Sequence, residues 1–95
     1  MTHYYVIAER GDGRTWWLSF PDGPGIFSAA DDAADIPAQA HEVLETVLMH
    51  PAGKLPLSIE AGARPPDAAT LAEFEQPVLV VVVPFEEAAE VKAAA

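Results

Sequence analysis

The segment WWLSFPDGPGIFSAADD, residues 16–32, joins two apolar runs through a stiff corner at residues 21–25. The two prolines of this corner each fix φ near about −65°, and its two glycines permit positive φ values that other residues avoid. The Asp22 carboxylate is suited to accept hydrogen bonds from the following amides and to stiffen the turn further. The segment therefore predicts a rigid corner between two strands.

Aromatic and β-branched residues on both sides of the corner predict an antiparallel meander. We expect the first strand over residues 3–9, the second over residues 15–20 and the third over residues 26–29. The glycine-rich residues 10–14 (RGDGR) predict the hairpin between the first two strands.

Trp17 has two competing interpretations. The alternation of a strand places Trp16, Leu18 and Phe20 on one face, and Trp17 and Ser19 on the other. Trp17 either packs across the sheet or acts as an anchor in an interface, where aromatic residues contribute much of the binding energy. The sequence leaves both interpretations open.

An amphipathic helix is predicted after the third strand, because apolar residues recur at helical spacing over residues 36–48. A proline is tolerated only in the first turn of a helix, so Pro37 indicates a start near Asp35. Asp35 is a candidate helix cap, and Asp31 and Asp32 offer caps for a looser turn before it.

The second half of the chain is rich in proline and less regular. Residues 67–75 predict a short helix capped by Asp67. The run VLVVVV at residues 78–83 is apolar at every position, which is typical of a strand covered on both faces or interior to a sheet. We expect one domain over residues 1–84 and a helical tail over residues 85–95.

The order β-β-β-α-β predicts an α+β fold. An antiparallel three-stranded meander and a further strand would form one sheet, with one main helix packed on it. An uncovered apolar sheet face would be costly in water, which favours self-association or partner binding at that face.

Composition narrows the classes of function. The 95 residues include 15 acidic and 5 basic ones, giving a net charge of −10, and no cysteine. This charge argues against direct binding of nucleic acid and is compatible with a basic partner, or simply with solubility. The N-terminus does not resemble a signal peptide and no apolar run is long enough to span a membrane, so we expect a cytoplasmic protein without a membrane partner.

The sequence gives little indication of a catalytic or metal-binding site. The histidines show no metal-ligand spacing, and the carboxylates that a magnesium-dependent hydrolase needs usually project from strand interiors. The aspartates here lie in predicted turns and at a helix start, where turn formation explains them. We therefore expect no catalytic residue, no metal and no cofactor, with a hydrolase as the alternative.

Residues 16–25 (WWLSFPDGPG) resemble the aromatic strand and Pro-Asp-x-Pro-Gly motif of HicB-like antitoxins from bacterial toxin–antitoxin systems. Ala30 and Asp31 stand where that family usually has Gly-Asp. Three further positions match the Ala, Glu and Leu of the family's helix, namely Ala40, Glu42 and Leu44. The resemblance extends over residues 3 to about 90.

The resemblance implies a partial ribonuclease-H-like fold without nuclease activity. It also implies binding of a small basic HicA-type toxin that cleaves messenger RNA, and self-association to a dimer or tetramer. Many relatives continue into a DNA-binding domain that binds their own promoter. This chain ends at Ala95, so we expect that domain to be absent and the chain not to bind an operator.

The preferred hypothesis is thus an antitoxin-like protein that occludes the surface of its toxin. The contact candidates are Trp17, Asp22, Asp31 and Asp32. A ribonuclease-H-like hydrolase and a stand-alone oligomerisation module without a toxin are the alternatives.

Overall fold

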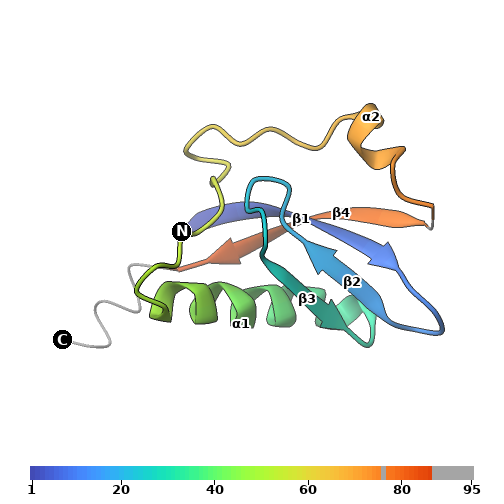
Figure 1. The fold of residues 1–95 in the computed structure, drawn as a ribbon, viewed down its shortest axis with the longest axis horizontal. Helices are drawn as coiled ribbons and strands as arrows, with labels where there is room; N and C mark the ends of the chain where they lie inside the picture. Colours follow the sequence, from blue (N-terminus) through green and yellow to red (C-terminus); the bar gives the residue numbers. More distant parts are fainter. Residues whose placement is uncertain (76, 87–95) are drawn as a thin grey trace.

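The computed structural model describes residues 1–75 and 77–86. These residues form one four-stranded antiparallel sheet in the order β3-β2-β1-β4, with one long helix packed on it (Figure 1). The elements are β1 (Thr2–Arg10), β2 (Trp16–Ser19), β3 (Phe27–Ala30), a 3-10 turn (Ala33–Asp35), α1 (Ile36–Met49), α2 (Ala68–Leu71) and β4 (Val78–Phe85). The predicted α+β fold in β-β-β-α-β order is confirmed. None of the described helices has the length and apolar character needed to cross a membrane.

The first three strands form the predicted meander. Ala8 of β1 lies opposite Leu18 of β2, which in turn lies opposite Ser28 of β3. The hairpin between β1 and β2 turns through Gly13, whose φ of 67° is strained for other residues. The predicted alternation of β2 is also confirmed, because Leu18 is buried whereas Trp17 is exposed.

The stiff corner is held by main-chain bonds and by packing. The Gly23 N–H donates to the Phe20 carbonyl (3.0 Å), and Gly25 adopts a φ of 84°. A Cβ at Gly23 would lie 3.0 Å from side-chain atoms of Pro56, so the corner packs closely against a later segment. The Asp22 carboxylate makes no hydrogen bond to any described residue, so the predicted stiffening by this side chain is wrong.

Helix α1 begins as the sequence predicts, at Ile36 with Pro37 in its first turn. The predicted cap positions of Asp35 and Asp32 are confirmed, but the predicted capping by their side chains is wrong. Asp35 occupies the position before α1 and Asp32 the position before the 3-10 turn, but neither side chain makes a cap hydrogen bond. The Asp32 carboxylate instead accepts a hydrogen bond from Arg14, a residue distant in sequence.

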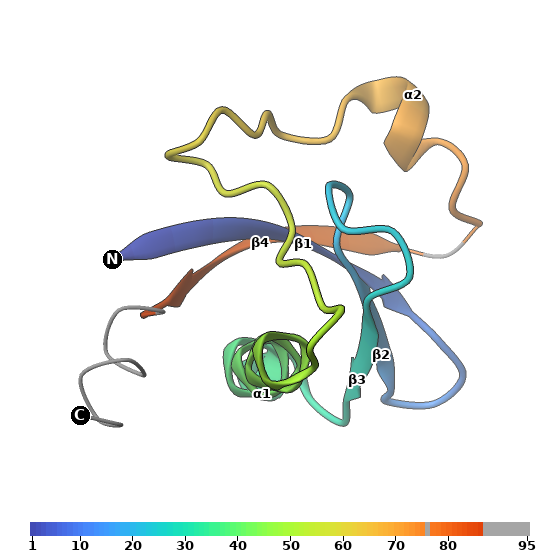
Figure 2. The ribbon, with the colours of Figure 1, turned by 60° about the vertical axis from the view of Figure 1, so that its left-hand side comes forward.

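The core lies between α1 and one face of the sheet (Figure 2). The helix contributes a stripe of buried side chains at helical spacing, and each strand contributes alternate residues, as expected for elements with one apolar face. The largest side chains with almost no exposure are Phe85, Leu18, Ile36, Leu44, Val6 and Val83.

Phe85 belongs to β4 and to this core. Its ring meets that of Tyr4 edge to face at 6.4 Å and that of His41 at 5.0 Å. Phe85 was predicted to lie in the helical tail, and that assignment is wrong because the residue ends β4. The rest of the predicted tail, residues 87–95, lies outside the described residues.

Residues 54–75, which we call the strap, cross the sheet face opposite α1 (Figure 2). Helix α2 makes a single turn within the strap and is shorter than the predicted residues 67–75. Its predicted cap is confirmed: the Asp67 carboxylate accepts a hydrogen bond from the Thr70 N–H (2.8 Å), which lowers the pKa of Asp67.

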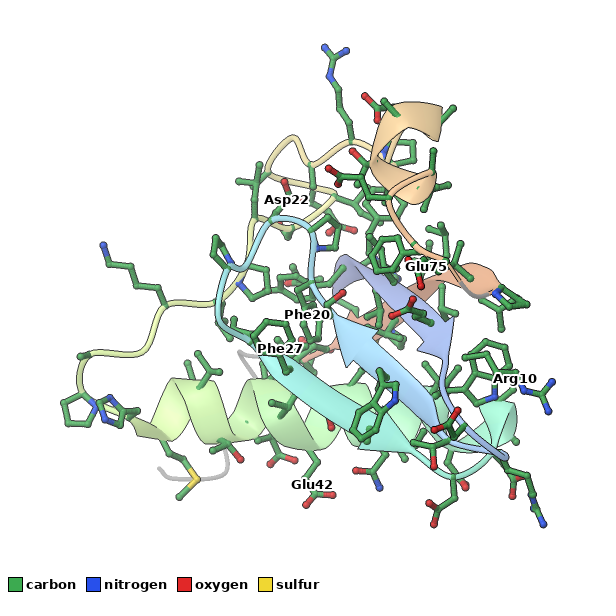
Figure 3. The ribbon with its side chains drawn as sticks, turned by 45° about the vertical axis from the view of Figure 1, so that its right-hand side comes forward. Arg10, Phe20, Asp22, Phe27, Glu42 and Glu75 are labelled. Atoms are coloured by element: carbon green, nitrogen blue, oxygen red, sulfur yellow. The ribbon has the colours of Figure 1, made fainter. Side chains whose placement is uncertain are left out.

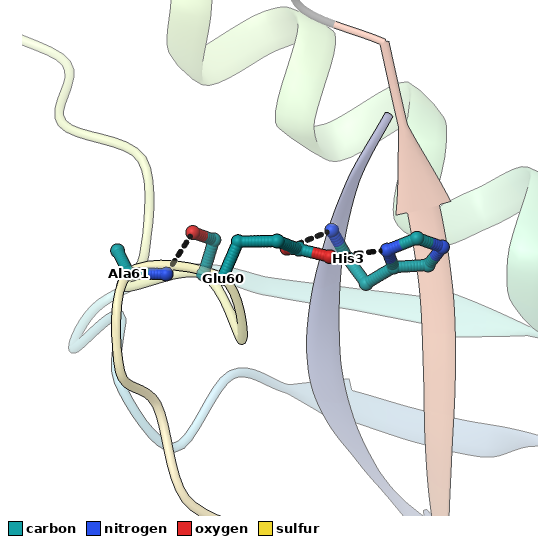
Figure 4. A network of polar contacts seen from close by, with 4 residues as sticks. His3, Glu60 and Ala61 are labelled. Carbon is teal, nitrogen blue, oxygen red and sulfur yellow. Dashed lines mark hydrogen bonds and ion pairs between the residues drawn. The ribbon is translucent and has the colours of Figure 1, made fainter.

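The strap also covers the part of β1 that β2 does not reach. The β1–β2 register begins at Ile7, so the main-chain groups of His3 on that side need other partners. The Ile59 N–H donates to the His3 carbonyl (2.8 Å), and the His3 N–H donates to Glu60 Oε1 (2.8 Å). Glu60 Oε2 lies 2.6 Å from His3 Nδ1 (Figure 4). The His3 amide bond and the ring contact lower the pKa of Glu60 to about 2.

The predicted position of the valine run is wrong. Strand β4 pairs only with β1 and lies at the edge of the described sheet, whereas β1 is interior. Leu79, Val80 and Val82 are 41%, 39% and 50% exposed. A continuously apolar run predicts coverage on both faces, but here α1 covers only the end of β4 that holds Val83 and Phe85.

Candidate partner-binding site

Two aromatic side chains are exposed on the sheet face opposite α1, on β2 and β3. Trp17 is 56% exposed and Phe27 is 69% exposed. The register places Trp17 opposite Ala29 and Phe27 opposite Ser19, so the two aromatic residues are diagonal neighbours on one face. Such neighbours lie about 7–8 Å apart. We call these four residues the aromatic patch, in which two small side chains separate two large ones.

The hairpin positions the Trp17 side chain. A Cβ at Gly11 would lie 2.7 Å from Cδ1 of Trp17, so the indole rests directly over the Gly11 main chain. The Gly11 N–H donates to the Thr15 carbonyl (2.8 Å), which closes the hairpin beneath the ring. Trp17 therefore packs on the hairpin while 56% of it stays exposed, which favours its interpretation as an interface anchor.

Carboxylates flank the aromatic patch. Asp22 precedes β3 in the corner, and Asp31 and Asp32 follow directly after it. All three residues are exposed. A four-residue strand such as β3 spans about 13 Å, so acidic groups lie at both ends of a short edge. Figure 3 shows Asp22 at the tip of the corner that joins β2 to β3. The structure thus gathers all four predicted contact residues around the β3 side of the sheet.

An open cavity lies at the end of β3 that leads to α1. Its volume is about 400 Å³, and it is lined by Arg14, Asp31, Asp32 and Asp35. Arg14 Nη2 donates to Asp32 Oδ1 (2.7 Å), and this hydrogen bond, with the charge of Asp32, raises the pKa of Arg14. Asp31 and Asp35 have no ion pair with any described residue, so the cavity has an excess of negative charge.

The charged groups of this region are open to solvent. In residues 1–75 and 77–86, no group of three histidine, aspartate or glutamate side chains is arranged to hold a metal ion. The acidic groups are exposed, so they offer ion pairs to the lysine or arginine side chains of another molecule.

Phe27 belongs to the candidate site, although the sequence pattern did not single it out as a contact residue. The signal was present, because pairing the second and third strands across the stiff corner puts Phe27 and Trp17 on one face. It required the register of that hairpin, which follows from the length and geometry of the turn.

Comparison with known proteins gives one solved structure that shares this fold. No family model matches the chain, and no curated protein matches it. A chain in a structure described as "HicA3 and HicB3 toxin-antitoxin complex" is 23% identical, with a TM-score of 0.65. The match covers 88% of the present chain and 98% of that chain. The likeness therefore extends over nearly the whole sheet-and-helix unit and establishes a shared fold.

Proposed function

We propose that this chain is an antitoxin-like binding protein that neutralises a small basic toxin of the HicA type by covering its surface. The observation that carries the proposal is the aromatic patch, exposed and flanked by carboxylates. The fold shared with a chain of a HicA3–HicB3 complex supports it. In this proposal the protein acts in the bacterial cytoplasm by occupancy alone, without a catalytic residue, metal or cofactor.

Charge favours the antitoxin side of such a pair. The net charge of −10 opposes binding to RNA phosphates, which a messenger-RNA-cleaving toxin must approach. The same charge attracts a basic protein and speeds its encounter. We therefore expect no direct contact of this chain with nucleic acid.

The aromatic patch and its acidic flanks would have different tasks. Trp17 and Phe27 are suited to insert into apolar hollows of the partner, where large rigid side chains provide much of the affinity. Asp22, Asp31 and Asp32 are exposed, so they would act mainly on the association rate and on the orientation of the partner.

The test is co-expression with the small basic protein encoded beside this chain. We expect that protein to inhibit growth alone, to be harmless together with this chain, and to co-purify with it. Trp17→Ala or Phe27→Ala alone should weaken the complex by roughly 30-fold, since one anchor typically contributes about 2 kcal/mol, and the two substitutions combined should weaken it by roughly several hundred-fold.

The matched control is Met49→Ala, which removes a side chain that is 84% exposed at the end of α1 and outside the aromatic patch. It should leave the affinity unchanged. A neighbour that is harmless alone, or a complex that the double substitution leaves intact, would show that the proposal is wrong.

A further inference from the structure

We propose that the basic partner binds as an added strand on the open edge of β3, through an extended segment that carries both apolar and basic residues. The identity of this occupant rests on the function proposed above, whereas the choice of edge rests on main-chain geometry. The sheet order β3-β2-β1-β4 gives β3 a neighbour on one side only. Strand addition supplies affinity through main-chain hydrogen bonds and specificity through alternate side chains.

The hydrogen bonds of β1 show which way its main-chain groups point. The Arg10 N–H donates to the Pro77 carbonyl next to β4 (2.9 Å), and the Gly11 N–H donates to the Thr15 carbonyl next to β2 (2.8 Å). In an antiparallel strand the N–H and C=O of one residue point to the same side, and neighbouring residues alternate. Odd-numbered residues of β1 therefore face the β2 side. His3 agrees, because its N–H and C=O both bond to the strap rather than to β4.

The same alternation continues through β2 to β3. Trp17 pairs with the odd-numbered Glu9, so its main-chain groups point to β1. Those of the next residue, Leu18, then point to β3, where Leu18 pairs with Ser28. Ser28 therefore points back to β2. The residues of β3 whose main-chain groups point outward are Phe27 and Ala29.

These outward groups are open to a further strand. Within residues 1–75 and 77–86, β3 pairs with β2 alone, and no other main-chain group bonds to Phe27 or Ala29. An added antiparallel strand would exchange N–H···O=C bonds with both residues. We choose this direction because every strand pair of the sheet is antiparallel, and such pairs are slightly more stable per residue than parallel ones.

The side chains along this edge determine the apolar part of the added segment. Phe27 and Ala29 lie on the sheet face of the aromatic patch, and Phe27 is 69% exposed. A partner residue opposite the small Ala29 would lie diagonally beside Phe27, and the partner residue two positions away would lie directly opposite Phe27. Apolar side chains at these two alternate positions would cover the exposed ring.

Charge determines the basic part of the segment. Asp22 precedes β3, Asp31 and Asp32 follow it, and all three are exposed. A lysine or arginine just before and just after the two apolar positions would reach these carboxylates. The other edge of the sheet offers a basic segment no such partner, because residues 77–85 contain no charged side chain.

The same charges disfavour a second copy of this chain as the occupant. An antiparallel pairing of two β3 strands would bring the Asp22 end of each copy to the Asp31 end of the other. Like charges placed opposite each other destabilise a strand pair. A basic segment from another protein avoids this repulsion.

The first experiment is amide hydrogen exchange of the full chain, alone and in complex with the small basic protein encoded beside it. Exchange at the Phe27 and Ala29 amides should slow at least about tenfold in the complex. The Ser28 amide bonds to β2 in both states and is the internal reference. The Val80 amide points outward at the β4 edge by the same alternation, and it should keep its rate.

Proline substitution tests the hydrogen bonds themselves. Ala29→Pro removes an N–H that β2 does not use, so the chain should fold and its affinity for the basic protein should fall at least about tenfold. Ala29→Ser keeps this N–H and should bind normally. Val82→Pro is the matched control, because it removes an outward N–H at the β4 edge and should leave the affinity unchanged. Circular dichroism identifies a variant that does not fold, and the exchange pattern of the unmodified chain then decides.

The outcomes separate this inference from the proposed function. A complex in which the Phe27 and Ala29 amides exchange as fast as in the free chain overturns the inference and leaves the function standing. Slowed exchange at Val80 instead, or equal losses of affinity in the two proline variants, also overturns it. If the two proteins form no complex, the proposed function fails and the inference fails with it.

Discussion

The indole of Trp17 rests on the bare main chain of Gly11, with no room between them for a methyl group. Through this contact a tryptophan that is 56% exposed still packs against its own hairpin. The glycine that allows the hairpin thus also provides the floor on which the proposed anchor lies.

Gly11→Ala should displace the Trp17 ring, because the new Cβ would stand 2.7 Å from Cδ1. The ring is free to swing toward solvent, so we expect the stability to change by about 1 kcal/mol or less. Affinity for the partner should fall and Trp17 fluorescence should shift, measured in a Trp16→Phe background. Gly13→Ala is the control: it strains a residue with φ of 67° in the same hairpin, but its Cβ would meet no atom within 4 Å. Equal losses of affinity in both variants would contradict this explanation.

Phe85 is buried and Phe27 is exposed, so replacing each by alanine compares the effect of burial on the free energy of unfolding. Phe85 is 1% exposed and contacts Tyr4 and His41, whereas Phe27 is 69% exposed. Phe85→Ala should lower the free energy of unfolding by about 3–5 kcal/mol, through lost burial and the cavity left behind. Phe27→Ala should change it by less than about 0.5 kcal/mol. Urea unfolding of both variants measures the difference, and comparable losses would refute the placement of Phe85 in the core.

The contact between Glu60 and His3 should make the attachment of the strap sensitive to acid. The pKa of Glu60 is lowered from 4.5 to about 2 in the folded chain. A lowered pKa means that the contact stabilises the fold above pH 4.5, and that this contribution is lost as the pH falls from 4.5 toward 2. Thermal unfolding between these values should show a steeper loss for the unmodified chain than for Glu60→Gln. Glu73→Gln, in the same strap, should retain the steep loss.

Arg14 should weaken the negative electrostatic potential of the acidic cavity. Arg14→Ala removes the only positive charge among the cavity's lining residues and frees Asp32 from its ion pair. If a basic partner approaches this side, its association rate should rise roughly threefold at low salt, and Asp32→Asn should lower the rate. Stopped-flow measurements at two salt concentrations give the comparison. Arg64→Ala makes the same charge change in the strap, outside the cavity, and an equal acceleration there would argue against a local effect.

Local sequence patterns predicted several elements of the fold correctly. The meander follows from alternation in the second strand and from turn residues on both sides of it, which act over a few positions. The start of α1 follows from Pro37, and the cap of α2 from Asp67, because each depends on its immediate neighbours. Trp17 was recognised as a candidate for the same reason, since its face depends only on the period of its own strand.

The tertiary structure decided the features that depend on partners distant in sequence. Asp32 pairs with Arg14 rather than capping a helix, and Glu60 holds His3 across most of the chain. An apolar run such as β4 is compatible with an interior or an edge position in a sheet. The strand order decided between them, because β1 pairs with β2 on one side and with β4 on the other, which leaves β4 at the edge. The stiff corner at residues 21–25 combines local and tertiary determinants in the same way. Its prolines and glycines determine a rigid turn locally, but the facing of Phe27 and Trp17 and the packing of Gly23 on Pro56 required the folded chain.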